Sequence, residues 1–101
     1  MTEIKSENGN VVRIADEVLA VIAGTAAMEA DGVVALAGRK GRSKGVAVAV
    51  KDAKVRLRVA ITVKAGKKLQ EVAREVQQRV RTNIETMTGL DVVAVNVTVL
   101  A

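Results

Sequence analysis

Two features of this chain have residue types that could do chemistry, and the first is a pair of glutamates in a predicted helix. Glu71 and Glu75 are four residues apart, so a helix places both carboxylates on one face. Paired carboxylates can act as general acid and base or as metal ligands. However, Glu75 precedes Arg79 by four residues, and Arg74 and Arg81 lie close by in sequence. We therefore interpret this face as a solvated helix surface of mixed charge, without a catalytic role.

The second feature is a basic, glycine-rich segment, residues 38–45, which contains Arg39, Lys40, Arg42 and Lys44. A phosphate-binding P-loop leads into a helix, whereas a strand is predicted after Gly45, so this motif is rejected. Gly38 and Gly41 have the GxxG spacing of KH domains, but there the loop joins two helices and here it joins two strands. Three interpretations stay open: a KH-like contact, a solvated hairpin tip, and an electrostatic contact with an anionic partner.

The residue types that the chain lacks restrict its chemistry further. It has no histidine, no cysteine and no aromatic residue. Without imidazole and thiol groups, acid–base catalysis by histidine, thiolate chemistry and nearly every zinc or copper site are excluded. Without aromatic rings, no platform exists on which bases or sugars could stack. We predict that the protein is not an enzyme and uses no cofactor, no metal and no small-molecule substrate.

Length and charge indicate a single small domain with an affinity for anionic partners. The chain has 101 residues and a net charge of +5, with a pI near 10.0. The longest apolar run, from Val18 to Met28, is too short to cross a bilayer, and we expect no signal peptide, since the first residues lack a basic segment followed by an apolar one. The absence of cysteine fits a reducing compartment. We therefore expect a cytoplasmic location.

Hydrophobic periodicity predicts two helices. The first runs from Asp16 to about Ala30, and its apolar stripe is Val18, Leu19, Ile22, Ala26 and Ala27. Gly24 lies within it among small residues, which indicates close packing against another element. The second helix runs from about Lys68 to the stop at Gly89, and its apolar stripe is Leu69, Val72, Ala73, Val76, Val80, Ile84 and Met87.

Short stretches of alternating or β-branched residues predict five strands, at residues 11–14, 33–37, 46–50, 55–63 and 92–100. A turn over residues 51–54 joins the third and fourth strands, and it places Val50 opposite Val55 with one apolar face along the hairpin. The other face carries Arg56 and Arg58 with further cations, opposite alanines. Together with the loop, these arginines form the candidate contact for an anionic partner: Arg39, Lys40, Arg42, Lys44, Arg56 and Arg58.

The predicted fold is α+β, a two-layer sandwich in the order β-α-β-β-β-α-β, with a single mixed sheet and both helices on one face. Residues 1–9 are expected to form a flexible tail, and residues 10–101 a single domain. The last strand has an apolar inner face. Its outer face is the candidate self-association surface, where an edge strand could add a partner strand: Val92, Ala94, Asn96, Thr98 and Leu100.

Two segments carry a resemblance to a known family. The first is GNVVRIADEVLAVIAGTAAMEADGVVAL, and the second is EVAREVQQRVRTNIETMTGLDVVAVNVTV, with its turn at Met87–Leu90 and its Val95-Asn96-Val97 strand. From about Gly9 to Leu100 the chain resembles the alkaline shock protein family, also called the envelope stress response family of Gram-positive bacteria.

This resemblance implies a small cytoplasmic protein without enzymatic activity, linked to cell-envelope homeostasis and stress. It also implies self-association and, for some members, a separate protein that holds them near the membrane. The sequence therefore predicts a homo-oligomeric scaffold that acts through protein partners, a membrane-anchoring protein among them. The alternative is a small nucleic-acid-binding module that uses the basic loop 38–45 and the basic sheet face.

Overall fold

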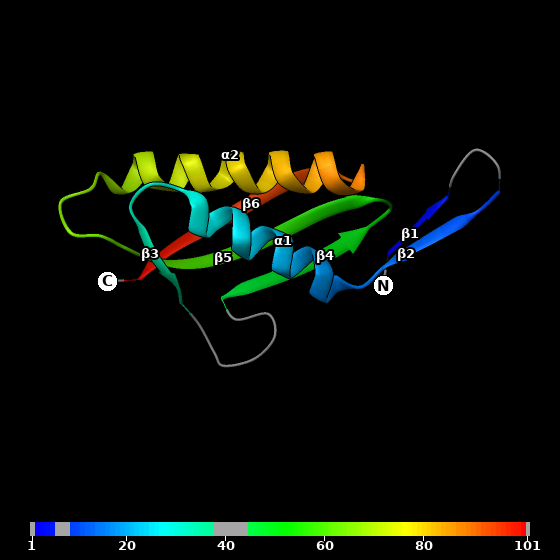
Figure 1. The fold of residues 1–101 in the computed structure, drawn as a ribbon, viewed down its shortest axis with the longest axis horizontal. Coiled ribbons are helices and arrows are strands. Elements are labelled where there is room, and N and C mark those ends of the chain that lie inside the picture. The colour runs from blue at the N-terminus through cyan, green and yellow to red at the C-terminus, as the bar shows by residue number, and fades with distance from the viewer. Residues whose placement is uncertain (1, 6–8, 38–44, 101) are drawn as a thin grey trace.

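The computed structural model describes residues 2–5, 9–37 and 45–100. Within them the predicted α+β class is confirmed, with two helices, a main sheet and a separate two-stranded sheet (Figure 1). The elements in chain order are β1 (Thr2–Lys5), β2 (Val11–Ile14), α1 (Asp16–Glu29), β3 (Val33–Leu36), β4 (Val46–Lys51), β5 (Lys54–Val63), α2 (Leu69–Thr88) and β6 (Asp91–Leu100).

The main sheet is organised around β5, which has strands on both sides. On one side β6 runs parallel to it over nearly its whole length. On the other side β3 and β4, both antiparallel to β5, follow one another along the same edge. The junction lies at Ala60: its N–H donates to the Gly45 carbonyl, and its carbonyl accepts from the Ala37 N–H, both at 2.8 Å. β3 and β4 therefore act as one edge strand, interrupted between Ala37 and Gly45.

Gly45 is required at this junction. Its φ is +75°, and a Cβ there would lie 2.6 Å from the Ala37 carbonyl oxygen. A side chain would thus both strain the backbone and push the end of β3 away from the start of β4. The basic residues Arg39, Lys40, Arg42 and Lys44 lie outside the described residues.

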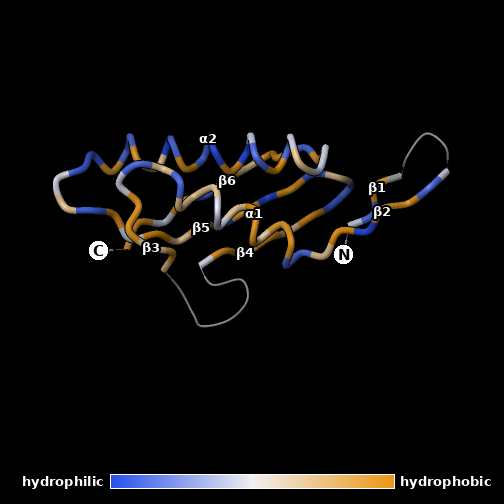
Figure 2. Tube along the Cα trace, in the orientation of Figure 1, coloured by the Kyte–Doolittle hydropathy of each residue, from blue (hydrophilic) through white to orange (hydrophobic). Residues whose placement is uncertain are grey.

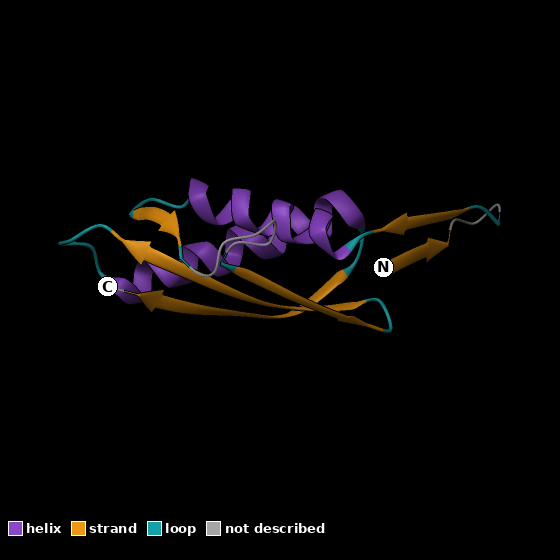
Figure 3. Cartoon of the chain, turned by 90° about the horizontal axis from the view of Figure 1, so that it is seen from below, coloured by secondary structure: helices purple, strands orange, loops and turns teal. Residues whose placement is uncertain are grey.

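Both helices cover the same face of the main sheet (Figure 3). Alternate residues of β5 point toward them and are fully buried: Val55, Leu57, Val59 and Ile61. From α2, one apolar stripe completes this core: Val72, Val76, Val80 and Ile84. Figure 2 shows the apolar residues of α2 on the side next to the sheet. The sandwich thus has one covered sheet face and one open face.

The first helix packs through small residues. Leu19 is its one large, fully buried side chain; the other buried positions are Ala20, Ala23, Gly24, Ala26 and Ala27. A Cβ on Gly24 would lie 3.0 Å from the Leu36 Cδ1 on β3. The close packing predicted from Gly24 and its small neighbours is therefore confirmed. Because small residues supply most of the contact, larger apolar residues are left on the outer side of α1.

The N-terminal segment differs from the prediction. Thr2–Lys5, expected in a flexible tail, forms β1 and pairs antiparallel with β2, whose predicted place in the single main sheet is also wrong. Ile4 packs against the core, and Arg13 donates to Glu3 across the pair at 2.9 Å. A four-residue strand is too short for periodicity to reveal without knowledge of its partner. The hairpin extends one end of a molecule that measures 51 × 25 × 18 Å (Figure 1).

The first residues of β6 also differ from the prediction. The register shifts between Val55 and Arg56, so Val92 pairs with Val55 while Ala94 pairs with Arg56. Val93 is the extra residue of this bulge. As a result Val92 is 3% exposed and belongs to the core, whereas Val93 is 38% exposed. The predicted outer face is thus wrong at Val92, although Asn96, Thr98 and Leu100 are on the less buried side of β6, as expected.

The β4–β5 hairpin follows the predicted register, with Val50 opposite Val55 and Val46 opposite Val59. Its turn is shorter than expected, since only Asp52 and Ala53 lie between the strands. Both have positive φ, the conformation of a type I′ turn, which matches the twist of the flanking strands. Three apolar residues predicted to face the core lie instead at exposed positions near helix ends: Val18, Leu69 and Met87.

We expect the Val76→Asp substitution to lower the free energy of unfolding by at least about 3 kcal/mol, because it places an unpaired charge in the core. Val76 is 0% exposed at the centre of the α2 stripe. Urea unfolding followed by circular dichroism measures the change. Gln78→Asp, at an exposed position of the same helix, is the control and should cost far less. Equal unfolding midpoints for the two variants would contradict the assigned core face.

Candidate functional site

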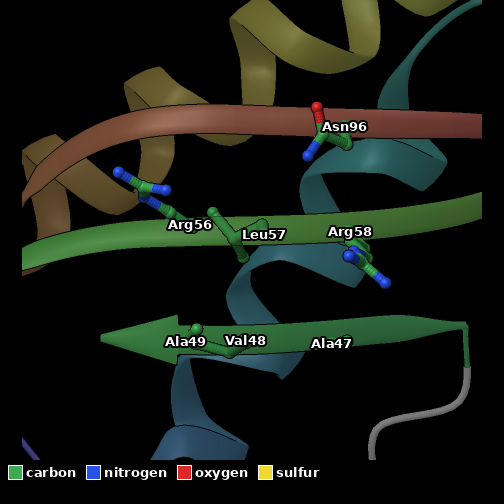
Figure 4. A pocket seen from close by; sticks show the side chains of 7 residues that line it. All are labelled: Ala47, Val48, Ala49, Arg56, Leu57, Arg58 and Asn96. Carbon is green, nitrogen blue, oxygen red and sulfur yellow. The ribbon is translucent and has the colours of Figure 1, made fainter. Parts of the chain in front are cut away.

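The face of the main sheet opposite the helices has no covering element among the described residues. Arg56 and Arg58 extend from β5 on this face (Figure 4). Arg58 pairs with Ala47 on β4 and with Asn96 on β6, so the arginine is flanked by smaller side chains on both sides. A shallow depression results, lined by Ala47, Val48, Ala49, Arg56, Leu57, Arg58 and Asn96. This arrangement leaves the guanidinium groups accessible to a partner that lies flat on the sheet.

The two arginines of this face have no counter-charge bonded to them in the part of the chain that the structure describes. In the described part of the chain, Arg56 and Arg58 form no ion pair and donate no hydrogen bond through their side chains. A second depression continues toward the hairpin turn and includes Lys51 and Lys54, with Asp52 as the nearby acid. An open surface with a net excess of cations attracts acidic or phosphorylated surfaces.

The structure brings together only part of the predicted anionic-partner contact. Arg56 and Arg58 share one face, two residues apart on β5. Ala37 and Gly45, the described residues at the ends of the basic loop, flank Ala60, which follows Arg58 by two residues. The side chains of the loop itself are outside the described residues, so their part in the contact stays a prediction.

The predicted self-association strand, β6, offers two surfaces to a partner: side chains on the open sheet face and a backbone edge without a neighbouring strand. Ala94, Asn96 and Thr98 share the open sheet face with the arginines, because they pair with Arg56, Arg58 and Ala60. In the described residues β6 pairs only with β5, so its other edge has no strand neighbour. Two side chains of α2 bond to this edge: Gln77 Nε2 donates to the Val95 carbonyl at 3.1 Å, and Glu85 accepts from the Val92 N–H at 3.1 Å.

A polar groove that sequence reasoning did not identify lies between α2 and this edge. It is lined by Arg74, Gln77, Gln78, Arg81, Thr82 and Val95. The helical residues follow the spacing i, i+3, i+4, i+7, i+8, which is one face of a helix. That spacing is visible in the sequence, but polar residues there indicated only a solvated surface. Their position beside an unpaired strand edge is a tertiary feature.

The candidate glutamates have structural partners. Glu75 accepts a hydrogen bond from the Asp31 N–H at 2.5 Å and pairs with Arg79 at 3.5 Å. Arg79 also approaches Glu29 at 3.8 Å, so these side chains connect the end of α1 to α2. Glu71 pairs with Lys68 at 3.9 Å. The interpretation of this face as a charge-rich helix surface agrees with these contacts. Over residues 2–5, 9–37 and 45–100, no acidic residues are grouped as a metal site would require.

The outer side of α1 has the opposite character to the open sheet face. Val18, Val21 and Met28 are exposed there, although they are large and apolar. The helix begins with Asp16 and Glu17 and ends with Glu29, and it contains no basic residue. An apolar surface with acidic ends is typical of an interaction site. Neither of the two described helices combines the length and apolarity needed to cross a membrane.

The amino-acid sequence matches a known protein family and several of its relatives. The model of the alkaline shock protein family, described as having a cell envelope-related function, matches residues 3–101. The chain is 34% identical over 97 residues to YqhY of Bacillus subtilis, covering 85% of this chain and 72% of that protein. It is 30% identical over 108 residues to YloU of the same organism and to Spy1614 of Streptococcus pyogenes, covering 94% of this chain in both cases. These alignments cover 89% of YloU and 88% of Spy1614.

Solved structures with a similar fold come from a more distant protein. MamM-CTD superposes with a TM-score of 0.59 over 86% of this chain and 99% of its own. The sequence identity is 14%, so the similarity shows the fold alone.

We expect Lys67→Met to raise the pKa of Asp31. The hydrogen bond from Lys67 Nζ to Asp31, 2.9 Å long, and the charge of Lys67 together lower the pKa of this carboxyl below 3.8, its ordinary value. A lowered pKa in the folded state means that this interaction stabilises the fold above pH 3.8 and is lost as the pH falls through the folded value. An NMR titration of the Asp31 carboxyl carbon measures the shift. Lys68→Met, whose ammonium pairs with Glu71, is the control and should leave the titration unchanged.

Proposed function

Because the chain belongs to the alkaline shock protein family, whose function is described as cell envelope-related, we propose that it is a non-catalytic scaffold of the cell envelope. It acts through self-association and through protein partners. A cytoplasmic location, beside a membrane-anchoring protein that binds it, belongs to the same proposal and is supported by the resemblance described above.

The observation that carries this proposal is the one-sided covering of the main sheet. A sheet of this kind buries only the residues under its helices, and the opposite face is available to another molecule. The depressions found there are open and are lined mainly by small aliphatic residues and cations, with Asn96 and Asp52 among them. Such a surface suits a broad protein contact better than it suits the enclosure of a small substrate.

A second copy of the chain is the partner that best fits this face. The outer side of α1 is apolar with acidic ends, and the open sheet face is basic with small residues between the cations. The two surfaces lie on different layers of the sandwich, so one copy can place its α1 on the sheet of the next. This contact is heterologous: each copy uses one surface and leaves the other free. Repetition of it builds a ring or an open filament, and either is a suitable architecture for a scaffold.

The alternative function, a nucleic-acid-binding module, is favoured by one observation. Lys54, Arg56 and Arg58 are exposed along one strand, and in the described residues neither arginine forms an ion pair, although Asp91 lies opposite Lys54. A phosphate backbone could lie along this row. The lack of any aromatic residue argues against it, since single-stranded bases are held mainly by stacking.

We expect sedimentation velocity to show assembly that grows with protein concentration and persists at moderate salt, because half of the proposed contact is apolar. The double substitution Arg56→Glu/Arg58→Glu should weaken assembly at least about tenfold, or ~1.4 kcal/mol. Val21→Lys, on the other surface of the same contact, should weaken it similarly. Arg74→Glu/Arg81→Glu makes the same charge change on α2 and is the matched control.

The same experiment tests the alternative. A protein that stays monomeric at all concentrations, and binds an RNA oligonucleotide with steep salt dependence, would replace the scaffold proposal with the nucleic-acid module. Equal weakening by both double substitutions would instead show that net charge controls the assembly, without a specific role for the open sheet face.

A further inference from the structure

We propose that the groove between α2 and the free edge of β6 binds an extended acidic peptide from a partner protein, which adds to β6 as a further strand. The site is separate from the open sheet face and from α1, so it goes beyond the proposed self-association. It assigns a role to Arg74 and Arg81 and to the outer edge of β6.

The first argument is the free strand edge. β6 has ten residues and pairs with β5 on one side only in the described part of the chain. Since the Val95 carbonyl bonds to a side chain of α2, it points away from β5. Backbone groups alternate in direction along a strand, so Val97 and Val99 present theirs toward the same outer edge. An incoming strand can pair with these groups.

The second argument is the way in which α2 occupies part of this edge. The Gln77 side-chain amide donates to the Val95 carbonyl, which is the bond that the N–H of an added strand would make. Gln77 is exposed, and its amide can turn to water when a peptide N–H takes its place on the Val95 carbonyl. Beyond the groove, the Glu85 carboxylate accepts a hydrogen bond from the Val92 N–H. This bond occupies the backbone group that an added strand would need at that end of β6. The open stretch therefore runs from Val95 to the end of β6.

The third argument is charge. Arg79, on another face of α2, pairs with two glutamates. In contrast, Arg74 and Arg81 have no acidic partner among the described residues, and both line the groove. Seven residues of helix separate them by about 10 Å, so their long side chains can reach carboxylates at alternate positions of one extended peptide. Charge-assisted hydrogen bonds from guanidinium to carboxylate would then select an acidic sequence.

Two other occupants fit less well. If the β6 edges of two copies paired about a two-fold axis, the arginines of both grooves would face one another without acids, which is repulsive. A nucleic acid would satisfy the arginines but would leave the strand edge unpaired, and the chain has no aromatic residue on which its bases could stack. A peptide satisfies both the backbone edge and the arginines.

The test uses the intact protein and a fluorescein-labelled peptide of eight alternating valines and glutamates, with binding followed by fluorescence anisotropy. Arg74→Glu/Arg81→Glu should weaken binding at least about tenfold, because two charge-assisted contacts are lost. Lys64→Glu/Lys68→Glu makes the same change in net charge at exposed positions between β5 and α2, outside the groove and the open-face depressions, and should bind as the parent does. Circular dichroism checks that both variants fold.

A second probe leaves the protein unchanged. The same peptide, N-methylated at alternate residues, keeps its charge but loses the N–H groups that strand addition needs, so it should bind at least about tenfold more weakly. Equal binding of the methylated peptide would overturn strand addition. Equal weakening by the two double substitutions would overturn the groove as the site, and tighter binding of an RNA oligonucleotide through Arg74 and Arg81 would overturn the peptide as its ligand. None of these outcomes depends on whether the protein self-associates.

Discussion

The central position of β5 is the constraint on which the rest of the structure depends. This strand pairs with β6 on one side and with β3 and β4 on the other, and its odd-numbered residues form the floor of the core. Because side chains alternate along a strand, burying Val55 and Leu57 necessarily directs Arg56 and Arg58 to the opposite face. The core and the basic surface are thus two consequences of one strand register. A shift of the register by one residue would turn the arginines toward the core and the apolar residues toward the open face.

The aliphatic composition explains why the two helices bury side chains of different size. Without aromatic residues, the core gains its area from many small side chains, and α2 contributes a stripe of larger ones. The first helix uses alanines and Gly24 to approach β3 and β4 closely. Apart from Leu19 and Ile22, its larger apolar residues lie outside the core, and Val18, Val21 and Met28 remain on the surface. The exposed apolar face of α1 therefore follows from how this helix packs.

Charges on the surface divide into compensated and uncompensated groups. Glu75, Arg79, Asp31 and Lys67 bond to one another or to backbone, and they connect the end of α1 to the beginning of α2. The arginines of the open sheet face and of the α2–β6 groove have no such partners in the described part of the chain. Guanidinium groups are always charged, so leaving them without acids favours binding of an external acidic group over internal stability. This division separates the residues that hold the fold from those proposed to bind partners.

Both helices and the register of the β4–β5 hairpin could be predicted from the sequence, because each depends on contacts between residues that are close along the chain or on a strict period. The close packing at Gly24 could be predicted from its small neighbours, although the strand that it packs against could not. The membership of β1 and β2 in their own sheet, the bulge at Val93 and the groove beside Arg74 could not. Each of these depends on which distant segment lies alongside: β1 forms only with β2, Val92 turns inward only because β5 sets its register, and Arg74 borders a strand edge only because β6 ends the sheet. Periodicity describes one element at a time, whereas strand order and register are decided when the elements pack on a common core.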